Sequence, residues 1–296
     1  MARRSATTLT ARARPRAAAG HMLRGGTVAR HVALVLFVLI TLLPLFWVLL
    51  LSIKSIPDAY NRTLWPRHFD FAHYGYVLSK NSTLPRNILN SIMVTLSTVV
   101  LATIAAVLGG YALVHLRTRG RAVVVALLVA SLFFPTRVTS LIAIWQIQRS
   151  LGLINTTMGL VLPYTALNMA LSVFIMRGIF ESVSHEMVDA ARIDGAGAVR
   201  TLWHVLLPLV VNGVVVVVIV NFVAIWGEYL LALTLIDDQS ARTLVVVLAG
   251  DIGGLGAYQI PRIAATYVLA VAPGLVIFAL AQRWYMRGLL EGAFKQ

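Results

Sequence analysis

Long apolar stretches, separated by shorter polar ones, run along most of the chain. Six of them approach or exceed the roughly 20 residues that a helix needs to cross a bilayer. We therefore predict an all-α membrane protein with six transmembrane helices: Val32–Ile53, about Ile88–Val114, Ala122 to about Ile147 with a break at Pro135, Met158–Met176, about Leu206–Leu235 and Ile263–Ala281. The mixed polarity of residues 144–156 predicts a short amphipathic helix at the outer membrane surface.

The composition excludes several other classes of protein. Hydrophobic residues make up 59% of the 296 residues and charged residues only 12%. A soluble domain has about 25% charged residues, so a soluble enzyme, a disordered chain and a fibrous repeat are all excluded. The chain has no cysteine, which rules out disulfides, thiolate nucleophiles and Cys-ligated zinc.

The basic residues fall unevenly on the two sides that six crossings define. Sixteen of the 25 Lys and Arg residues lie with the N-terminus, loop 115–121, loop 177–205 and the C-terminal tail, and nine lie on the opposite side. Basic residues concentrate in cytoplasmic segments. We therefore predict that both termini are cytoplasmic and that loop 54–87 is external. The same bias accounts for the net charge of +14, so no nucleic-acid partner is expected.

Residues 1–30 contain seven arginines and no acidic residue. This pattern predicts a disordered cytoplasmic tail that lies against anionic lipid, followed by a membrane domain over 31–296.

Aromatic residues are frequent in loop 54–87. Either they anchor the loop at the membrane interface or they form a docking surface for an external partner: Trp65, Phe69, Phe71, Tyr74 and Tyr76.

The chain lacks the common motifs of nucleotide, metal and ester chemistry. None of its three lysines follows a glycine, so it cannot build the G-x-x-x-x-G-K-[ST] phosphate loop. It has neither H-E-x-x-H nor G-x-S-x-G, and its seven histidines form no metal-spaced pair on one helix. We expect no catalytic residue, no metal site and no cofactor in this chain.

A few polar or aromatic residues inside the spans are candidates for lining a transport pathway. An ionisable residue in a membrane segment is a functional candidate by default, although Arg137 and Glu228 also lie near the outer interface, where their charges can reach water. Mid-helix asparagines either bond between helices or line a cavity. The candidates are Arg137, Asn168, Asn221, Trp226 and Glu228.

Residues 181–208 form the most informative polar segment. Ser184 can cap a helix over His185–Ile193 that has Glu186 in its first turn and pairs Asp189 with Arg192. Gly195 is suited to the positive φ that ends such a helix. A second short helix, about Ala198–His204, precedes Pro208. The pattern predicts a helix–turn–helix knob, which is either a docking element or simply an ordered loop.

This segment resembles the EAA loop of ABC-transporter permeases, E-A-A-x3-G-x9-I-x-L-P. Here the match reads Asp189-Ala190-Ala191, three residues, Gly195, nine residues, then Val205-Leu206-Leu207-Pro208, with Asp for Glu and Val for Ile. In that family the loop forms the helices that insert into the ATPase subunit. The resemblance therefore implies ATPase-coupling residues: Glu186, Asp189, Ala190, Ala191, Asp194, Gly195, Ala196, Leu207 and Pro208.

Other segments resemble the smaller, six-helix permease of maltose-type carbohydrate importers. They are G-L-I-N-T-T-M-G-L-V-L-P-Y at 152–164, W-P-R-H-F-D-F-A-H-Y at 65–74 and, in the C-terminal tail, Glu291-Gly292-Ala293-Phe294-Lys295. Trp226-Gly227-Glu228-Tyr229 resembles a W-N-E-F motif in which Gly replaces Asn.

The resemblance implies the type I permease fold, in which the first helix wraps a partner and the other five form the core. It also implies a second, different permease, two ATPase subunits that hold ATP and Mg, and an extracytoplasmic binding protein at a bacterial inner membrane. The transported solute would be a sugar or oligosaccharide. Alternatives are an ABC permease for a glycerol phosphodiester or a peptide, an ion-coupled secondary carrier, and a membrane-embedded enzyme.

Overall fold

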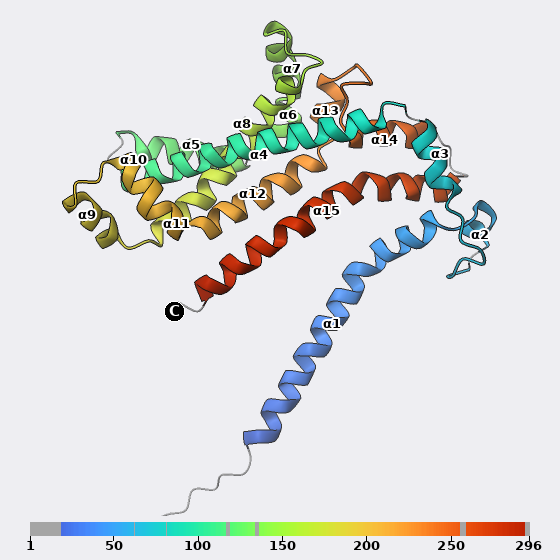
Figure 1. Ribbon diagram of the computed structural model, residues 1–296, viewed down its shortest axis with the longest axis horizontal. Coiled ribbons are helices and arrows are strands. Elements are labelled where there is room, and N and C mark those ends of the chain that lie inside the picture. The colour runs from blue at the N-terminus through green and yellow to red at the C-terminus, as the bar shows by residue number, and fades with distance from the viewer. Residues whose placement is uncertain are drawn as a thin grey trace, which may run out of the picture.

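Helices make up most of the chain in the computed structural model, which describes residues 19–61, 63–80, 82–116, 119–133, 136–254 and 259–293 (Figure 1). Within these ranges the only extended pairing is one antiparallel bridge, between Lys54 and Phe69. The prediction of an all-α protein is confirmed. The helices are α1 (Ala19–Ser52), α2 (Ile56–Tyr60), α3 (Ala72–Lys80), α4 (Leu84–His115), α5 (Arg121–Phe133), α6 (Thr136–Thr139), α7 (Leu141–Ser150), α8 (Thr157–Glu181), α9 (His185–Ile193), α10 (Ala198–Arg200), the π-helix η1 (Thr201–Leu206), α11 (Leu207–Leu209), α12 (Val211–Trp226), α13 (Leu230–Leu235), α14 (Leu244–Gly254) and α15 (Ile260–Ala293).

In the described ranges, four helices are long and apolar enough to cross a membrane without a break. They are Val28–Ser52 within α1, all of α4, all of α8, and Ile260–Leu280 within α15. The first, second, fourth and sixth predicted spans are therefore confirmed. Helix α1 begins at Ala19 and so reaches into the range predicted to be the basic tail. Residues 1–18 of that tail lie outside the described residues.

The third predicted span is divided among α5, α6 and α7. Helix α5 has 13 residues, about 20 Å, which is too short alone for a hydrocarbon core of about 30 Å. The predicted break at Pro135 lies outside the described residues. Beyond it, α6 leads into α7, which contacts α13 and projects away from the bundle (Figure 1). Helix α7 is the predicted amphipathic helix, but it begins and ends earlier, at Leu141 and Ser150.

The fifth predicted span is divided as well. A helical run over Ala198–Leu209 meets α12 at an angle of 80°. Pro208 lacks the N–H that would continue the helix, and Val210 has a non-helical ψ of 10°. Helix α12 ends at Trp226, about two and a half turns before the predicted end of the span. Hydropathy did not detect either break, because both lie within largely apolar sequence.

Helices α4 and α8 pack side by side, and α12 packs against both of them (Figure 1). Glycine permits their close approach. A Cβ atom added at Gly110 would lie 2.9 Å from the Met176 Cβ and 3.0 Å from the main-chain nitrogen of Arg177. Any other residue at this position would push the two helices apart, so α4 and α8 form one tightly packed unit.

Helix α1 diverges from this bundle (Figure 1). Its side chains from Val28 to Phe46 are exposed, and burial begins near Leu50, where the chain approaches the rest of the protein. Lipid or another protein must cover an apolar surface of this length.

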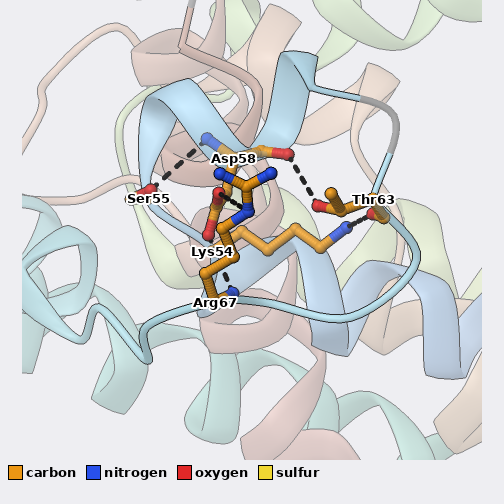
Figure 2. A network of polar contacts seen from close by, with 5 residues as sticks. All are labelled: Lys54, Ser55, Asp58, Thr63 and Arg67. Atoms are coloured by element: carbon orange, nitrogen blue, oxygen red, sulfur yellow. Dashed lines mark hydrogen bonds and ion pairs between the residues drawn. The ribbon is translucent and has the colours of Figure 1, made fainter.

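The segment after α1 folds back on itself through a polar network (Figure 2). The Lys54 side chain is only 1% exposed. Its ammonium group donates to the main-chain oxygen of Thr63 and lies 4.9 Å from the centre of the Trp47 ring. The buried Asp58 carboxylate accepts the Arg67 N–H at 2.9 Å. These contacts fix the polar segment at the end of the bundle that carries α3, which we call the α3 end; the opposite end is the α9 end (Figure 1).

Two of the aromatic residues predicted in this segment are held by polar partners. The Tyr74 hydroxyl lies 2.6 Å from Ser52 Oγ, and the Arg262 guanidinium lies 4.1 Å from the centre of the Tyr76 ring. The other rings are exposed: Trp65, Phe69 and Phe71. These exposed rings are consistent with both interpretations of the loop.

Candidate functional site

Residues 181–208 form the predicted knob, at the α9 end of the bundle (Figure 1). Ser184 Oγ accepts the N–H of Glu186 at 3.2 Å and caps α9. Glu186 lies in the first turn, where the helix dipole favours a negative charge. Helix α9 has the predicted bounds, so the cap, the helix and its length are confirmed.

Gly195 ends α9 with a φ of 77°, as predicted. Its N–H bonds to the oxygen of Arg192 at 3.0 Å, and the N–H of Ala196 bonds to the oxygen of Ala191 at 2.9 Å. Together these bonds form a Schellman motif, which satisfies the last carbonyl groups of the helix. The sharp turn after α9 is therefore built from local backbone bonds and does not rely on neighbouring elements.

The knob buries one face and exposes the other. Val188 packs into a buried cluster with Leu202 and Leu206, and Ala191 is buried as well. Ala191 is thus the one predicted coupling residue that the structure assigns to the inner face. The remaining predicted coupling residues are exposed or half-buried: Glu186, Asp189, Ala190, Asp194, Gly195, Ala196, Leu207 and Pro208.

Three large apolar side chains of this segment are more than half exposed, and the sequence analysis did not single them out. Ile193 is 86% exposed, Val199 71% and Trp203 56%. Large exposed apolar residues on an ordered helix are typical of a protein contact surface. Their signal in the sequence was their position within an otherwise polar segment.

Two hydrogen bonds tie the knob to the last turns of α4. The predicted pair of Asp189 and Arg192 is present, at 3.3 Å, and the Arg192 guanidinium also donates to the main-chain oxygen of His115 at 3.1 Å. The Tyr111 hydroxyl donates to the main-chain oxygen of Ala198 at 3.0 Å. Loops 115–121 and 177–205 therefore lie at the same end of the bundle, as the predicted topology requires.

The second helix of the knob is not a regular α-helix. The predicted run over Ala198–His204 begins as α10 and continues as the π-helix η1. Leu207 and Pro208 follow in α11, directly before the 80° bend. Turns of π-helix are rare and occur frequently at functional sites.

Two of the candidate pathway residues, Asn168 and Asn221, belong to one polar column between α8 and α12. The buried Asn221 amide donates to Ser172 Oγ at 2.8 Å. Ser172 Oγ donates to the main-chain oxygen of Asn168 at 2.9 Å, and the Asn168 side-chain amide donates to the main-chain oxygen of Tyr164 at 2.7 Å. The three α8 residues are spaced four apart and so lie on one face of the helix. Asn221 thus bonds between helices, whereas the Asn168 amide bonds to the main chain of its own helix.

Glu228 continues the column at its far end. Its carboxylate accepts the Tyr164 hydroxyl at 2.5 Å and the N–H groups of Leu231 and Ala232 at 3.1 and 3.3 Å. Glu228 therefore caps α13 and links it to α8. Arg137 lies in α6, but its side chain lies outside the described residues.

Trp226 borders two apolar recesses between α12 and α15, of about 220 and 340 Å³; α14 adds side chains to the smaller one. Its ring stacks on Phe222 with 5.8 Å between centroids, and its Nε1 donates to the oxygen of Ala270 at 3.3 Å. A Cβ atom added at Gly274 would lie 2.6 Å from that nitrogen. The absence of a side chain at Gly274 therefore lets the Trp226 indole pack directly against α15.

At the α3 end, α4 holds the loop between α13 and α14. The Asn87 amide donates to the oxygens of Gln239 and Arg242 at 2.8 and 2.9 Å. The Asn90 amide donates to the oxygens of Ser240 and Arg242 at 2.9 and 3.1 Å. Sequence reasoning did not identify these two asparagines, since their partners lie about 150 residues away.

The tip of this loop is acidic. The N–H and hydroxyl of Ser240 bond to the Asp238 carboxylate and hold its pKa below the usual range of an aspartate. The side-chain oxygen of Asn155 accepts the N–H of Asp237 and of Asp238 at 2.6 and 3.2 Å. Asp238 therefore remains ionised at neutral pH, on a loop that is fixed from two sides.

Comparison with known proteins places the chain among transport subunits. Residues 75–290 match the family described as binding-protein-dependent transport system inner membrane component. Over 268 residues the chain is 30% identical to the diacetylchitobiose uptake system permease protein NgcG of Streptomyces coelicolor. The aligned region covers 90% of this chain and 88% of NgcG. Over 272 residues it is 32% identical to the sulfoquinovosyl glycerol transport system permease protein SmoH of Agrobacterium fabrum, with coverage of 91% and 94%.

The fold is similar to that of a chain in a bacterial ABC transporter that imports the acidic polysaccharide alginate. The TM-score is 0.74 at 26% identity, and the match covers 92% of this chain and 100% of the other. These similarities confirm the predicted resemblance to carbohydrate ABC permeases. Because the family match includes every described helix from α4 to α14, the chain belongs to the binding-protein-dependent transport system inner membrane component family.

Proposed function

We propose that this chain is one of two membrane subunits of an ATP-driven bacterial importer, and that residues 181–208, the coupling loop, dock on a separate ATPase chain. The observation that carries this proposal is the geometry of the loop. Asp189 and Ile193 are exposed on a helix whose backbone a serine cap and a Schellman motif hold rigid. A docking element needs this combination of an exposed surface and a fixed backbone.

ATP and Mg would be held by two ATPase subunits, because this sequence has no phosphate-binding loop. ATP binding would draw the two ATPase subunits together and carry the coupling loops with them. The membrane subunits would then alternate between outward-open and inward-open states.

The proposed solute is a sugar or oligosaccharide, delivered by an extracytoplasmic binding protein. The names of the relatives support this class: diacetylchitobiose, sulfoquinovosyl glycerol and alginate are all carbohydrates or carbohydrate conjugates. The recesses beside Trp226 would face the pathway that this chain shares with its partner.

We further propose a position in the bacterial inner membrane with the α9 end and both termini in the cytoplasm. The excess of basic residues in the segments at that end supports this orientation. A second, different permease would complete the pathway. Among the described residues, the apolar side chains of α1 from Val28 to Phe46 are exposed, and this surface supports such a partner.

The test is to purify this chain with its second permease and its ATPase, and to measure ATPase retention and ATP hydrolysis. Ile193→Asp and Asp189→Lys should abolish retention, because each changes an exposed anchor; loss of such an anchor can exceed about 2 kcal/mol. Ser79→Asp, an equally exposed change at the α3 end, is the matched control. Normal retention in both coupling-loop variants would contradict the docking role. Sugar uptake by liposomes that contain this chain alone would instead indicate a secondary carrier.

A further inference from the structure

We propose that α4 transmits the movement of the coupling loop to the loop between α13 and α14 at the α3 end, residues 236–243, which we call the external loop. Tyr111 and Arg192 are the positioning residues that join the coupling loop to α4. This inference rests on the proposed function, since it assumes that an ATPase moves the coupling loop. It adds a route through the protein and two residues outside the positions that the sequence resemblance assigned to coupling.

The inner junction joins both helices of the coupling loop to one turn of α4. Arg192, on α9, donates to the oxygen of His115, and Tyr111 donates to Ala198, at the start of α10. The His115 oxygen belongs to the last turn of α4, where carbonyl groups lack partners within the helix. The guanidinium also carries the positive charge that the C-terminal end of a helix dipole attracts. The coupling loop is thus attached at two points, which prevents it from pivoting about either one.

Aromatic packing makes this junction stiff. The Tyr111 ring is 5% exposed and meets the Phe180 ring at the end of α8 edge-on, with 6.0 Å between centroids. The His115 ring lies 5.9 Å from the Phe180 ring and 5.6 Å from the His185 ring, at the start of α9. The rings of Tyr111, His115 and Phe180 are buried, and their packing leaves no room for the coupling loop to slide across α4.

The outer junction lies at the opposite end of the same helix. Asn87 and Asn90, in the first two turns of α4, hold the oxygens of Gln239, Ser240 and Arg242. The N–H of Leu244 bonds to Ser91 Oγ at 2.8 Å. The external loop is therefore fixed to α4 by its main chain and has to move with it.

The other possible route, along the polypeptide chain from α9 into α12, is less suited to transmit a displacement. From α9 it passes through the π-helix η1 and Pro208 and then bends by 80° into α12. Helix α4, in contrast, contains 32 residues with no internal proline beyond its first turn, and so spans about 48 Å as one rod. A continuous helix between two clamped ends transmits a rigid-body displacement, whereas a bent and loosely wound connection absorbs it.

The test uses the complete importer, with its binding protein, in nanodiscs. Because the native chain has no cysteine, Gln239→Cys can carry a single environment-sensitive fluorophore on the external loop. Addition of Mg·ATP with orthovanadate should change its fluorescence. In Tyr111→Phe and Arg192→Met the ATPase should remain bound and hydrolyse ATP. The fluorescence change should fall about 2- to 10-fold, because each variant loses one hydrogen bond between the coupling loop and α4. Arg192→Lys, which keeps a positively charged donor, should restore part of the signal.

Two variants of the same chemistry serve as controls outside the junction. Tyr60→Phe removes a hydroxyl from an exposed residue of α2, and Arg177→Met removes a guanidinium that pairs with Glu181 at 2.8 Å. Both should keep the full fluorescence change. A full change in Tyr111→Phe and Arg192→Met would overturn the proposal, as would an external loop that does not respond in the unmodified importer while ATP is hydrolysed. Loss of the ATPase from these two variants would also overturn it, because the residues would then be docking anchors. Failure of the unmodified chain to retain an ATPase would instead refute the proposed function.

Discussion

The Tyr164 hydroxyl and the Glu228 carboxylate meet at 2.5 Å, although 64 positions separate them in the sequence. Tyr164 lies on α8 and is 2% exposed. Glu228 lies in the short break between α12 and α13, where it also receives two backbone N–H groups. An acidic residue that hydropathy assigns to a membrane span is thus an N-terminal cap for one helix and a link to another. Glu228 therefore fixes the conformation of the chain between α12 and α13.

Replacement of Glu228 by Ala should therefore destabilise the protein. The change leaves the Tyr164 hydroxyl and two N–H groups without their acceptor, which costs about 1–3 kcal/mol. Thermal unfolding of the purified complex in nanodiscs would measure this. Glu228→Gln keeps an acceptor oxygen, so its loss of unfolding free energy should be less than half that of Glu228→Ala. Unchanged unfolding of Glu228→Ala together with lost transport would contradict the capping role and favour a direct role in the pathway.

Gly195→Val should weaken the coupling loop through the backbone. At a φ of 77° a β-branched residue is strained by roughly 1–3 kcal/mol. Gly197→Val is a close control, because Gly197 lies two residues away, is equally open around its Cβ position, and has a φ of −68°. We expect reduced ATPase retention in the first variant and near-normal retention in the second. Equal retention in both would show that the left-handed turn is dispensable.

Gly110→Ala should separate α4 from α8. The added Cβ atom would lie 3.0 Å from backbone atoms of the α8 chain, which cannot move as a side chain can. Overpacking of this kind costs typically about 1–3 kcal/mol. Gly178→Ala, on α8 with no atom within 4 Å of the new Cβ, should be neutral or slightly stabilising. The measurement is thermal unfolding of both variants, and an unfolding temperature of Gly110→Ala at or above that of Gly178→Ala would contradict the close-packing argument.

Single cysteines in the cysteine-free chain should report its orientation. Ser79→Cys at the α3 end should react with a membrane-impermeant thiol reagent in intact cells. Ser182→Cys at the α9 end should react only after permeabilisation, because the basic residues concentrate at that end. Both serines are exposed, so accessibility within the protein does not limit either reaction. Labelling of Ser182→Cys in intact cells would reverse the proposed orientation.

Features that depend on neighbouring residues were predictable from the sequence. The bounds of α9, the Ser184 cap and the left-handed Gly195 all follow from interactions within one or two helical turns. The long spans followed from hydropathy alone, because a helix that satisfies its own backbone bonds needs only apolar side chains to lie in a membrane. The family resemblance followed from residue spacing, without any knowledge of the fold.

Features that depend on contacts between distant segments were decided by the tertiary structure. The bend at Val210 and the end of α12 at Trp226 interrupt apolar sequence, and packing between helices determines where such a segment turns. Ala191 shares the motif of its exposed neighbours but is buried, because one face of α9 packs against the following helix η1. The asparagines at the start of α4 found their partners about 150 positions away. Local propensity and hydropathy contain no term for such pairings: a buried polar group takes whichever partner the fold brings within hydrogen-bond distance.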